Sequence, residues 1–251
     1  MIVLELEQQR FIRVGAAQVE QVDDPEKNLG TIVGMMKIWT PYADILCFPE
    51  ISLSGQAKDR DLTDLHEEIK RQARNTNLWV VYGAYTRRGD QIFNEAYIVD
   101  NKGSLRLTCQ KQNPWRDEKG VTAGSESSVI HTELGNLGVV ICWDLARPEN
   151  LRRLVAQGAE IVFCPSYWYK GEYRTTEVIR SMPLSRAFEN QIFLVYCDAY
   201  TQNGETVGLS KICSPTQVLA AAREGQREII TAILDREELG QSRKIFNCWQ
   251  V

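Results

Sequence analysis

The chain has 251 residues, of which 43% are apolar and 25% charged, and its formal net charge is −4. These proportions are ordinary for a globular protein that buries a sizeable core. The slight acidity disfavours nucleic acid or an anionic membrane surface as a general partner. No apolar run approaches the roughly 20 residues of a membrane-spanning helix, and the first ten residues lack the pattern of a secretory signal.

Cysteine and histidine usage restricts the chemistry further. The seven cysteines are odd in number and include no pair at CxxC spacing, so we expect reduced thiols in a cytoplasmic protein, without disulfides or a zinc site. The two histidines, His66 and His131, lie in a polar helical stretch and a short turn, and we expect both at the surface. This scarcity disfavours Ser-His-Asp and Cys-His mechanisms, so any thiol chemistry is expected to use a carboxylate as its base.

The hydrophobic pattern predicts strands that alternate with helices. The first half of the chain predicts a strand, a helix, a strand, a helix and three strands over residues 11–19, 25–38, 44–48, 61–75, 78–85, 91–99 and 105–110. After a polar loop over 112–127, we expect helices over 148–157 and 172–190, the second kinked near Pro183, and strands over 129–132, 138–142, 160–164, 191–197, 209–213, 217–221 and 228–234. Crossovers and hairpins together indicate a layered α/β protein with mixed sheets.

Domain organisation follows from what the chain lacks. No Gly/Ser/Pro-rich linker interrupts its middle, and no repeat of 20–50 residues is present. We therefore expect a single domain over 1–251 with its core at about 11–234, followed by a short polar extension.

Cys142 is the most informative residue. It follows the apolar run 137–141 and precedes Pro148, which is typical of a first helical turn. A thiol on a strand-to-helix turn projects from the edge of the sheet, and the backbone N–H groups after it are free to meet a developing oxyanion. Alone, Cys142 is as well explained by a buried structural thiol.

Two further residues follow strand-like runs in the same way. Glu50 comes directly after the run 44–48 and Pro49, and Lys111 ends the run 105–110. Taken singly, each has an ordinary explanation, as a solvated loop acid and as a surface lysine. Together with Cys142 they form the set that a thiol hydrolase without histidine needs. Cys142 would attack a carbonyl or nitrile carbon, Glu50 would carry the proton, and Lys111 with the N–H of Trp143 would stabilise the oxyanion.

The order of these motifs resembles the nitrilase superfamily, the carbon–nitrogen hydrolases. The resemblance runs in order from about residue 11 to 234. It is carried by Phe48–Glu50, Leu53–Gly55, Lys111, Gly138–Asp144, Arg147–Glu149, Gly158–Val162, Pro165–Trp168, Arg186–Asn190 and Gly208–Ile212.

This resemblance implies a four-layer α-β-β-α sandwich with mixed β-sheets and a Glu-Lys-Cys triad of Glu50, Lys111 and Cys142. It implies hydrolysis without a metal or cofactor, and assembly into a homodimer or larger homo-oligomer through the outer helices. The family often has a second glutamate after the lysine. Glu118 is our candidate for it, with Asp117 as the near rival.

The substrate pocket is less well defined by the sequence. Tyr167 and Trp168 follow a strand end and are candidates for its wall, although core or interface positions explain them equally well. Many relatives carry their arginine one place earlier than Arg147, a departure close to the expected pocket. We expect a small linear amide as substrate, cleaved with release of ammonia and a carboxylic acid. A nitrile substrate, a non-catalytic binding protein on the same fold, and acyl transfer to an amine remain open as alternatives.

Overall fold

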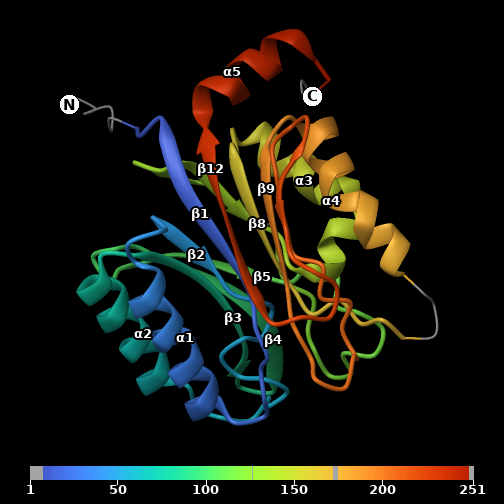
Figure 1. The fold of residues 1–251 in the computed structure, drawn as a ribbon. Coiled ribbons are helices and arrows are strands. Elements are labelled where there is room, and N and C mark those ends of the chain that lie inside the picture. The colour runs from blue at the N-terminus through green and yellow to red at the C-terminus, as the bar shows by residue number, and fades with distance from the viewer. Residues whose placement is uncertain (1–7, 126, 172–174, 249–251) are drawn as a thin grey trace.

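Two six-stranded sheets lie face to face in the computed structural model of the chain, which describes residues 8–125, 127–171 and 175–248 (Figure 1). In spatial order, the first sheet contains β12 (Glu228–Asp235), β1 (Phe11–Gln18), β2 (Ile45–Cys47), β3 (Trp79–Arg88), β4 (Gln91–Val99) and β5 (Leu105–Gln110). The second contains β11 (Val218–Ala221), β10 (Lys211–Cys213), β9 (Phe193–Asp198), β8 (Ile161–Ser166), β7 (Gly135–Val139) and β6 (Ile130–Thr132). Parallel and antiparallel pairs occur in both sheets.

Helices cover the two outer faces. The first sheet carries α1 (Pro25–Trp39) and α2 (Thr63–Thr76), and the second carries α3 (Pro148–Ala156) and α4 (Thr176–Asn190) (Figure 1). The resulting order of layers confirms the predicted α-β-β-α sandwich with mixed sheets. None of the described helices combines the length and the apolar character needed to cross a membrane.

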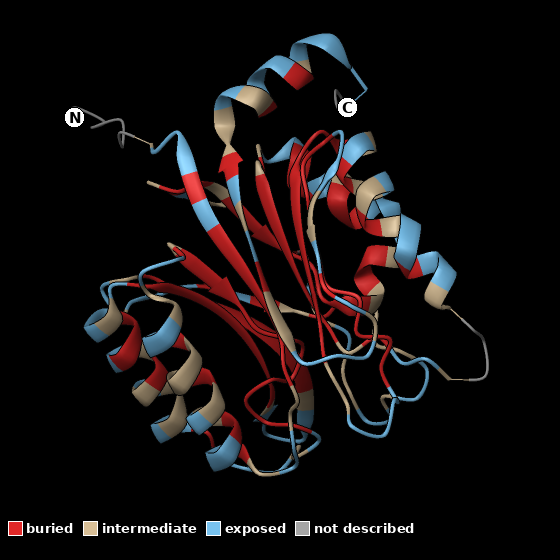
Figure 2. Cartoon of the chain, in the orientation of Figure 1, coloured by how far each residue is buried: buried red, intermediate tan, exposed pale blue. Residues whose placement is uncertain are grey.

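The core lies mainly between the sheets, and a second cluster lies beneath α1 and α2. Figure 2 shows the buried residues concentrated along the strands and on the inward faces of the helices. Val14, Val81 and Val139 are fully buried between the sheets, while Ile32 and Met36 of α1 are buried against the first sheet. Since each such side chain contributes about 1.5–3 kcal/mol when removed from water, these two clusters hold the layers together.

The C-terminal segment differs from the polar extension that we expected, because it forms a fifth helix, α5 (Arg236–Ile245). Asp235 caps its N-terminus, and acidic residues in the first turn and basic residues in the last turn complement the helix dipole. Leu239 is fully buried, and the Ser242 hydroxyl donates to Gln191. Only Leu239 and Ser242 of α5 are buried, and its polar composition is the reason that an extension was expected.

The predicted helix over 172–190 corresponds to α4, which runs from Thr176 to Asn190 with Pro183 inside it, and residues 172–174 lie outside the described residues. The expected surface position of His66 needs correction. His66 is half-buried because α2 packs its ring against the sheet, where Nδ1 lies 2.8 Å from the Tyr82 hydroxyl. Burial lowers the pKa of His66 to about 4. His131 is exposed, as expected.

Gly83 on β3 lies against the segment that carries Glu50. A Cβ at this position would meet the Ile51 backbone nitrogen at 2.6 Å. We expect Gly83→Ala to push this segment away and to lower the free energy of unfolding by about 1–3 kcal/mol, measured by denaturant unfolding. Gly30→Ala in α1 is the control, since a Cβ there has no neighbour within 4 Å. A Gly83→Ala protein as stable as the control variant would contradict this account of the packing.

Candidate active site

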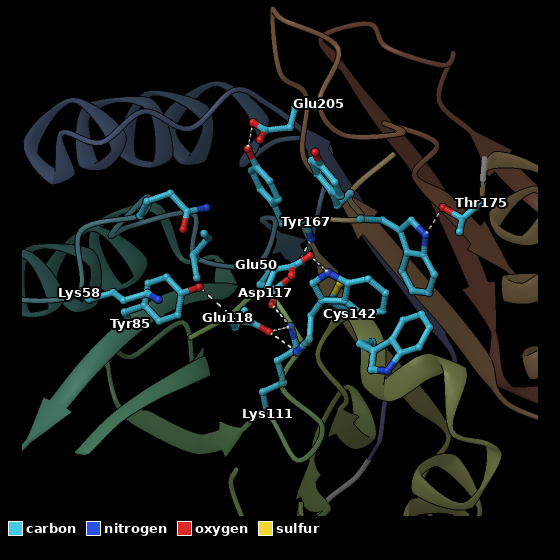
Figure 3. A pocket seen from close by; sticks show the side chains of 16 residues that line it. Glu50, Lys58, Tyr85, Lys111, Asp117, Glu118, Cys142, Tyr167, Thr175 and Glu205 are labelled. Carbon is cyan, nitrogen blue, oxygen red and sulfur yellow. Dashed lines mark hydrogen bonds and ion pairs between the residues drawn. The ribbon is translucent and has the colours of Figure 1, made fainter. Parts of the chain in front are cut away.

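The ends of neighbouring strands bring the predicted residues to one edge of the sandwich. Glu50 follows β2 and Lys111 follows β5. Between them, Tyr85 on β3 pairs with Asn94 on β4, and the Lys111 backbone N–H donates to the Asn94 carbonyl at 2.8 Å. Cys142 approaches from the second sheet, three residues after β7 ends (Figure 3). The structure therefore brings Glu50, Lys111 and Cys142 together from distant parts of the chain.

A buried cluster of two carboxylates and one ammonium forms at this edge. Lys111 Nζ lies 2.7 Å from Glu50 Oε1 and 2.5 Å from Glu118 Oε2. The three side chains are almost closed to solvent, at 2% exposure for Lys111, 4% for Glu50 and 13% for Glu118. Asn94 Nδ2 donates to both carboxylates, at 2.7 and 2.8 Å. Of the two acids that the sequence offered after Lys111, Glu118 is the one that contacts it, whereas Asp117 is exposed.

The cluster shifts the pKa of each member. Burial raises the pKa of Glu50, Lys111 opposes this, and the Glu118 charge adds to it. Burial also disfavours the charge on Lys111, but Glu50, Cys142 and Glu118 outweigh it and raise the pKa of the ammonium well above its usual range. For Glu118, burial is outweighed by Lys111, so its pKa is lowered. A firm Lys111–Glu118 ion pair thus stands beside a carboxyl group that accepts a proton more readily than an ordinary glutamate.

Glu50 also faces the thiol. Its second oxygen, Oε2, accepts the Tyr167 backbone N–H at 2.8 Å, and the Cys142 thiol contacts the same carboxyl group. Burial and the Glu50 charge raise the pKa of Cys142 well above its usual range, although Lys111 opposes this shift. The raised pKa of Cys142 favours its neutral thiol form, beside a carboxyl group that can accept a proton.

The backbone is strained at Cys142 and directly after Glu50. Cys142 has φ 47° and begins a short 3₁₀ helix, η1 (Cys142–Ala146), while Ile51, directly after Glu50, has φ 48°. Positive φ is rare for residues other than glycine, and for a β-branched residue such as isoleucine it is an outlier. The Trp143 N–H lies in the first turn of η1, where amide groups have no acceptor within the helix. It is therefore placed to donate to an oxygen near Cys142.

Asp144 holds the turn that carries Cys142. It accepts the Ile141 N–H at 3.1 Å and the backbone and side-chain N–H groups of Asn113 at 2.8 and 2.9 Å. Among the described ion pairs, none joins Asp144 to an arginine. Asp144 thus ties the turn that carries Cys142 to the loop that follows Lys111.

A cavity of about 450 Å³ opens onto these groups (Figure 3). One wall of the cavity, next to Cys142, contains three indole rings that pack side by side, with Trp143 between Trp115 and Trp168 at centroid distances of 4.5 and 5.5 Å. The predicted pocket residues Trp143, Tyr167 and Trp168 all line it. Among the described residues, the lining consists of Glu50, Ile51, Gln56, Lys58, Tyr85, Lys111, Trp115, Asp117, Glu118, Cys142, Trp143, Tyr167, Trp168, Tyr169, Thr175 and Glu205. In the described part of the chain, no group of three or more His, Cys, Asp or Glu side chains is arranged to hold a metal ion.

Sequence reasoning missed three contributors to the site. Asn94 bonds both glutamates, the Tyr85 hydroxyl donates to Glu118 Oε1 at 3.2 Å, and Trp115 extends the aromatic wall. Asn94 had a usable signal, because a polar amide within the mainly apolar strand β4 is unusual unless it has partners. Tyr85 and Trp115 carried no such signal, since aromatic residues are common in any strand or loop.

Comparison with known proteins places this geometry in a family. The family model described as "Carbon-nitrogen hydrolase" matches residues 13–244. The chain is 26% identical to the 2-oxoglutaramate amidase of Bacillus subtilis, over 88% of this chain and 89% of that protein. It is 27% identical to the deaminated glutathione amidase of Bos taurus, over 92% and 79% respectively.

Solved structures agree on the fold. A mutant of the Nesterenkonia AN1 amidase from the nitrilase superfamily superposes with a TM-score of 0.82 at 21% identity, covering 98% of this chain and 100% of that one. Because the family model spans nearly the whole sequence, the chain belongs to the carbon–nitrogen hydrolase family.

Proposed function

We propose that this protein hydrolyses the C–N bond of a small linear amide through a thioester on Cys142, releasing ammonia and a carboxylic acid. One observation carries the proposal: Cys142, Glu50 and a buried Lys111–Glu118 ion pair line one cavity. The catalytic roles assigned below are part of the proposal.

In the first half of the reaction, Cys142 Sγ attacks the carbonyl carbon while Glu50 takes the thiol proton. The carbonyl oxygen becomes an oxyanion that accepts hydrogen bonds from Lys111 Nζ and the Trp143 N–H. When this intermediate collapses, the C–N bond breaks. Glu50 returns the proton to the departing nitrogen, and ammonia leaves.

In the second half, a water molecule attacks the thioester carbon and passes one proton to Glu50. The same oxyanion donors act again, and collapse breaks the C–S bond. Glu50 then protonates the sulfur, which restores the thiol and releases the acid. Glu118 keeps Lys111 charged and in place throughout, so it acts as a positioning residue.

The relatives support amides as the substrate class, since the two described above are amidases by name. A structure of the Nesterenkonia amidase is described as showing covalent addition of the acetamide moiety of fluoroacetamide at the active-site cysteine. Nitriles would use the same residues in this chain and are the alternative substrate class.

The direct test of the proposal measures ammonia release from parallel panels of linear amides and nitriles. We expect turnover of amides, a single acyl adduct on Cys142 by mass spectrometry, and loss of both in Cys142→Ala, because the variant has no nucleophile. Cys248→Ala removes an exposed thiol far along the chain and is the control. Turnover that persists in Cys142→Ala would reject the thioester. Turnover of nitriles alone would make nitriles, and not amides, the substrate class. Binding of these compounds without acylation of Cys142 would indicate a non-catalytic protein.

The proposed base predicts the pH profile. Glu50 must be ionised to take the thiol proton. Because its pKa is raised above the ordinary 4.5, we expect kcat/KM to fall as the pH is lowered, with the midpoint of this decrease above pH 4.5. Glu118→Gln removes a negative charge that raises the pKa of Glu50, so the acid limb of the profile moves to lower pH even though the maximal rate falls. Asp117→Asn neutralises the exposed neighbour and serves as the control. An acid limb that stays in place in Glu118→Gln would exclude Glu50 as the group that sets it.

We also propose that the protein is cytoplasmic and that it forms a homodimer or larger assembly through its outer helices. Its seven cysteines are all free, and α4 exposes Val178 and Phe188 at 44% and 42%. Light scattering is expected to give at least twice the mass of the chain, and Val178→Arg is expected to shift it toward the monomer by placing a charge in the contact. A monomeric parent protein would contradict this assembly.

A further inference from the structure

Aromatic side chains form an unusually large share of the cavity wall. Among the sixteen described lining residues, six are aromatic, whereas 9% of the whole chain is: Tyr85, Trp115, Trp143, Tyr167, Trp168 and Tyr169. The three indole rings pack against one another, with Trp143 in the middle. The proposed hydrolysis uses the backbone N–H of Trp143 but gives none of the rings a role. The wall therefore remains to be assigned to a part of the substrate other than the scissile bond.

Two of the indoles are attached directly to residues of the reacting cluster. Trp143 follows Cys142 in the chain. The Trp115 backbone N–H donates to Glu118 Oε2 at 2.7 Å, the same oxygen that Lys111 contacts. Each of these rings therefore begins within one residue, or one hydrogen bond, of a group that the proposed reaction uses.

The third indole is held from the side of the proposed base. Trp168 follows Tyr167, whose backbone N–H donates to Glu50 Oε2 at 2.8 Å. The Trp168 backbone N–H donates at 2.8 Å to Asp198, a fully buried carboxylate that also accepts the Gly208 N–H at 2.9 Å. The whole wall is thus built onto the groups around the thiol, and an acyl group on that thiol shares a cavity with it.

The polar ends of the indoles are largely occupied within the protein. Trp168 Nε1 donates to the Thr175 hydroxyl at 3.0 Å, and Trp115 Nε1 donates to Asp117 at 3.1 Å (Figure 3). Trp115 and Trp143 are half-buried and both line the cavity. The wall therefore offers ring carbon more than hydrogen-bond donors, and a hydrocarbon group complements it better than a polar one.

We propose that the three indoles select amides whose acyl group ends in an aromatic ring, with Trp115 as a specificity-determining residue. The inference rests on the proposed amidase function and narrows its substrate class. The carbonyl group lies at Cys142, and the acyl chain carries its ring against the indoles. Burial of a phenyl group favours such a substrate by about 10- to 100-fold, and contact between aromatic rings adds about 2- to 12-fold. A cavity of about 450 Å³ is within the range that holds small ligands.

The test compares kcat/KM for propanamide, 3-cyclohexylpropanamide and 3-phenylpropanamide, which differ only in the group at the end of the chain. We expect the parent protein to favour the phenyl amide over propanamide by at least about tenfold, and over the cyclohexyl amide by at least about twofold. Trp115→Leu is expected to abolish the preference for phenyl over cyclohexyl, whereas Trp115→Phe keeps it. Both variants retain the backbone N–H that donates to Glu118.

Trp39→Leu is the matched control. Trp39 is also half-buried and packs edge-on against another aromatic ring, that of Tyr42, but it belongs to α1 and is not among the described lining residues. We expect this variant to keep the substrate ratios of the parent protein. A ratio between two substrates is independent of the fraction of a preparation that is folded, so partial unfolding of a variant does not imitate a loss of selectivity.

The parent protein alone already tests the inference. Equal kcat/KM for the phenyl and cyclohexyl amides, or no preference for either over propanamide, would overturn the selection of an aromatic group. An unchanged phenyl-to-cyclohexyl ratio in Trp115→Leu would overturn the role of Trp115. If none of the three amides is hydrolysed and Cys142 is not acylated, the proposed amidase function itself fails. Hydrolysis of all three at similar rates removes only this inference.

Discussion

The contact on which the site depends is the burial of Lys111 between Glu50 and Glu118. Burying a charged ammonium away from water costs too much free energy unless carboxylates compensate its charge. Burying either carboxylate without the ammonium would be similarly unfavourable. Removing one member of such a buried set costs about 3–5 kcal/mol because it strands the others. Since Glu118 belongs to the loop after β5 and Glu50 follows β2, their shared ammonium fixes that loop against the edge of the first sheet. The loop then supplies Asn113 to Asp144 and thereby meets the turn of the second sheet.

The same cluster sets the direction of proton movement in the proposed reaction. Burial raises the pKa of both Glu50 and Cys142, so ionisation of either group is less favourable than in water. A thiolate beside an ionised Glu50 would place two negative charges in contact. Transfer of the thiol proton to Glu50 keeps one negative charge, which moves to the substrate oxygen and then lies against Lys111. The nucleophile is therefore activated chiefly when a substrate is present, which protects a buried thiol from unproductive reactions.

Strand ends were predictable and side-chain contacts were not. The apolar runs that form β2 and β7 identify Glu50 and Cys142 as residues at the edge of a sheet, because burial of both faces gives a strong and continuous pattern. The choice between Asp117 and Glu118 depends on the path of an irregular loop, which hydrophobic periodicity does not encode. Asn94 and Tyr85 depend on the register of β3 against β4, where Tyr85 pairs with Asn94. Helix α5 was not predicted for a different reason: capping and charge stabilise it more than burial of apolar side chains does. The extent of a single domain over 1–251 stays a prediction.

Reactivity and selectivity are placed on different parts of this fold. Glu50, Lys111 and Cys142 extend from strand ends whose positions the two cores determine, and their geometry changes only if a sheet changes. Much of the cavity beyond them is lined from loops, among them the loop after β5 that carries Trp115 and Asp117. Substitutions in these loops can therefore change which substrate fits, whereas Glu50, Lys111 and Cys142 keep the positions that the sheets give them.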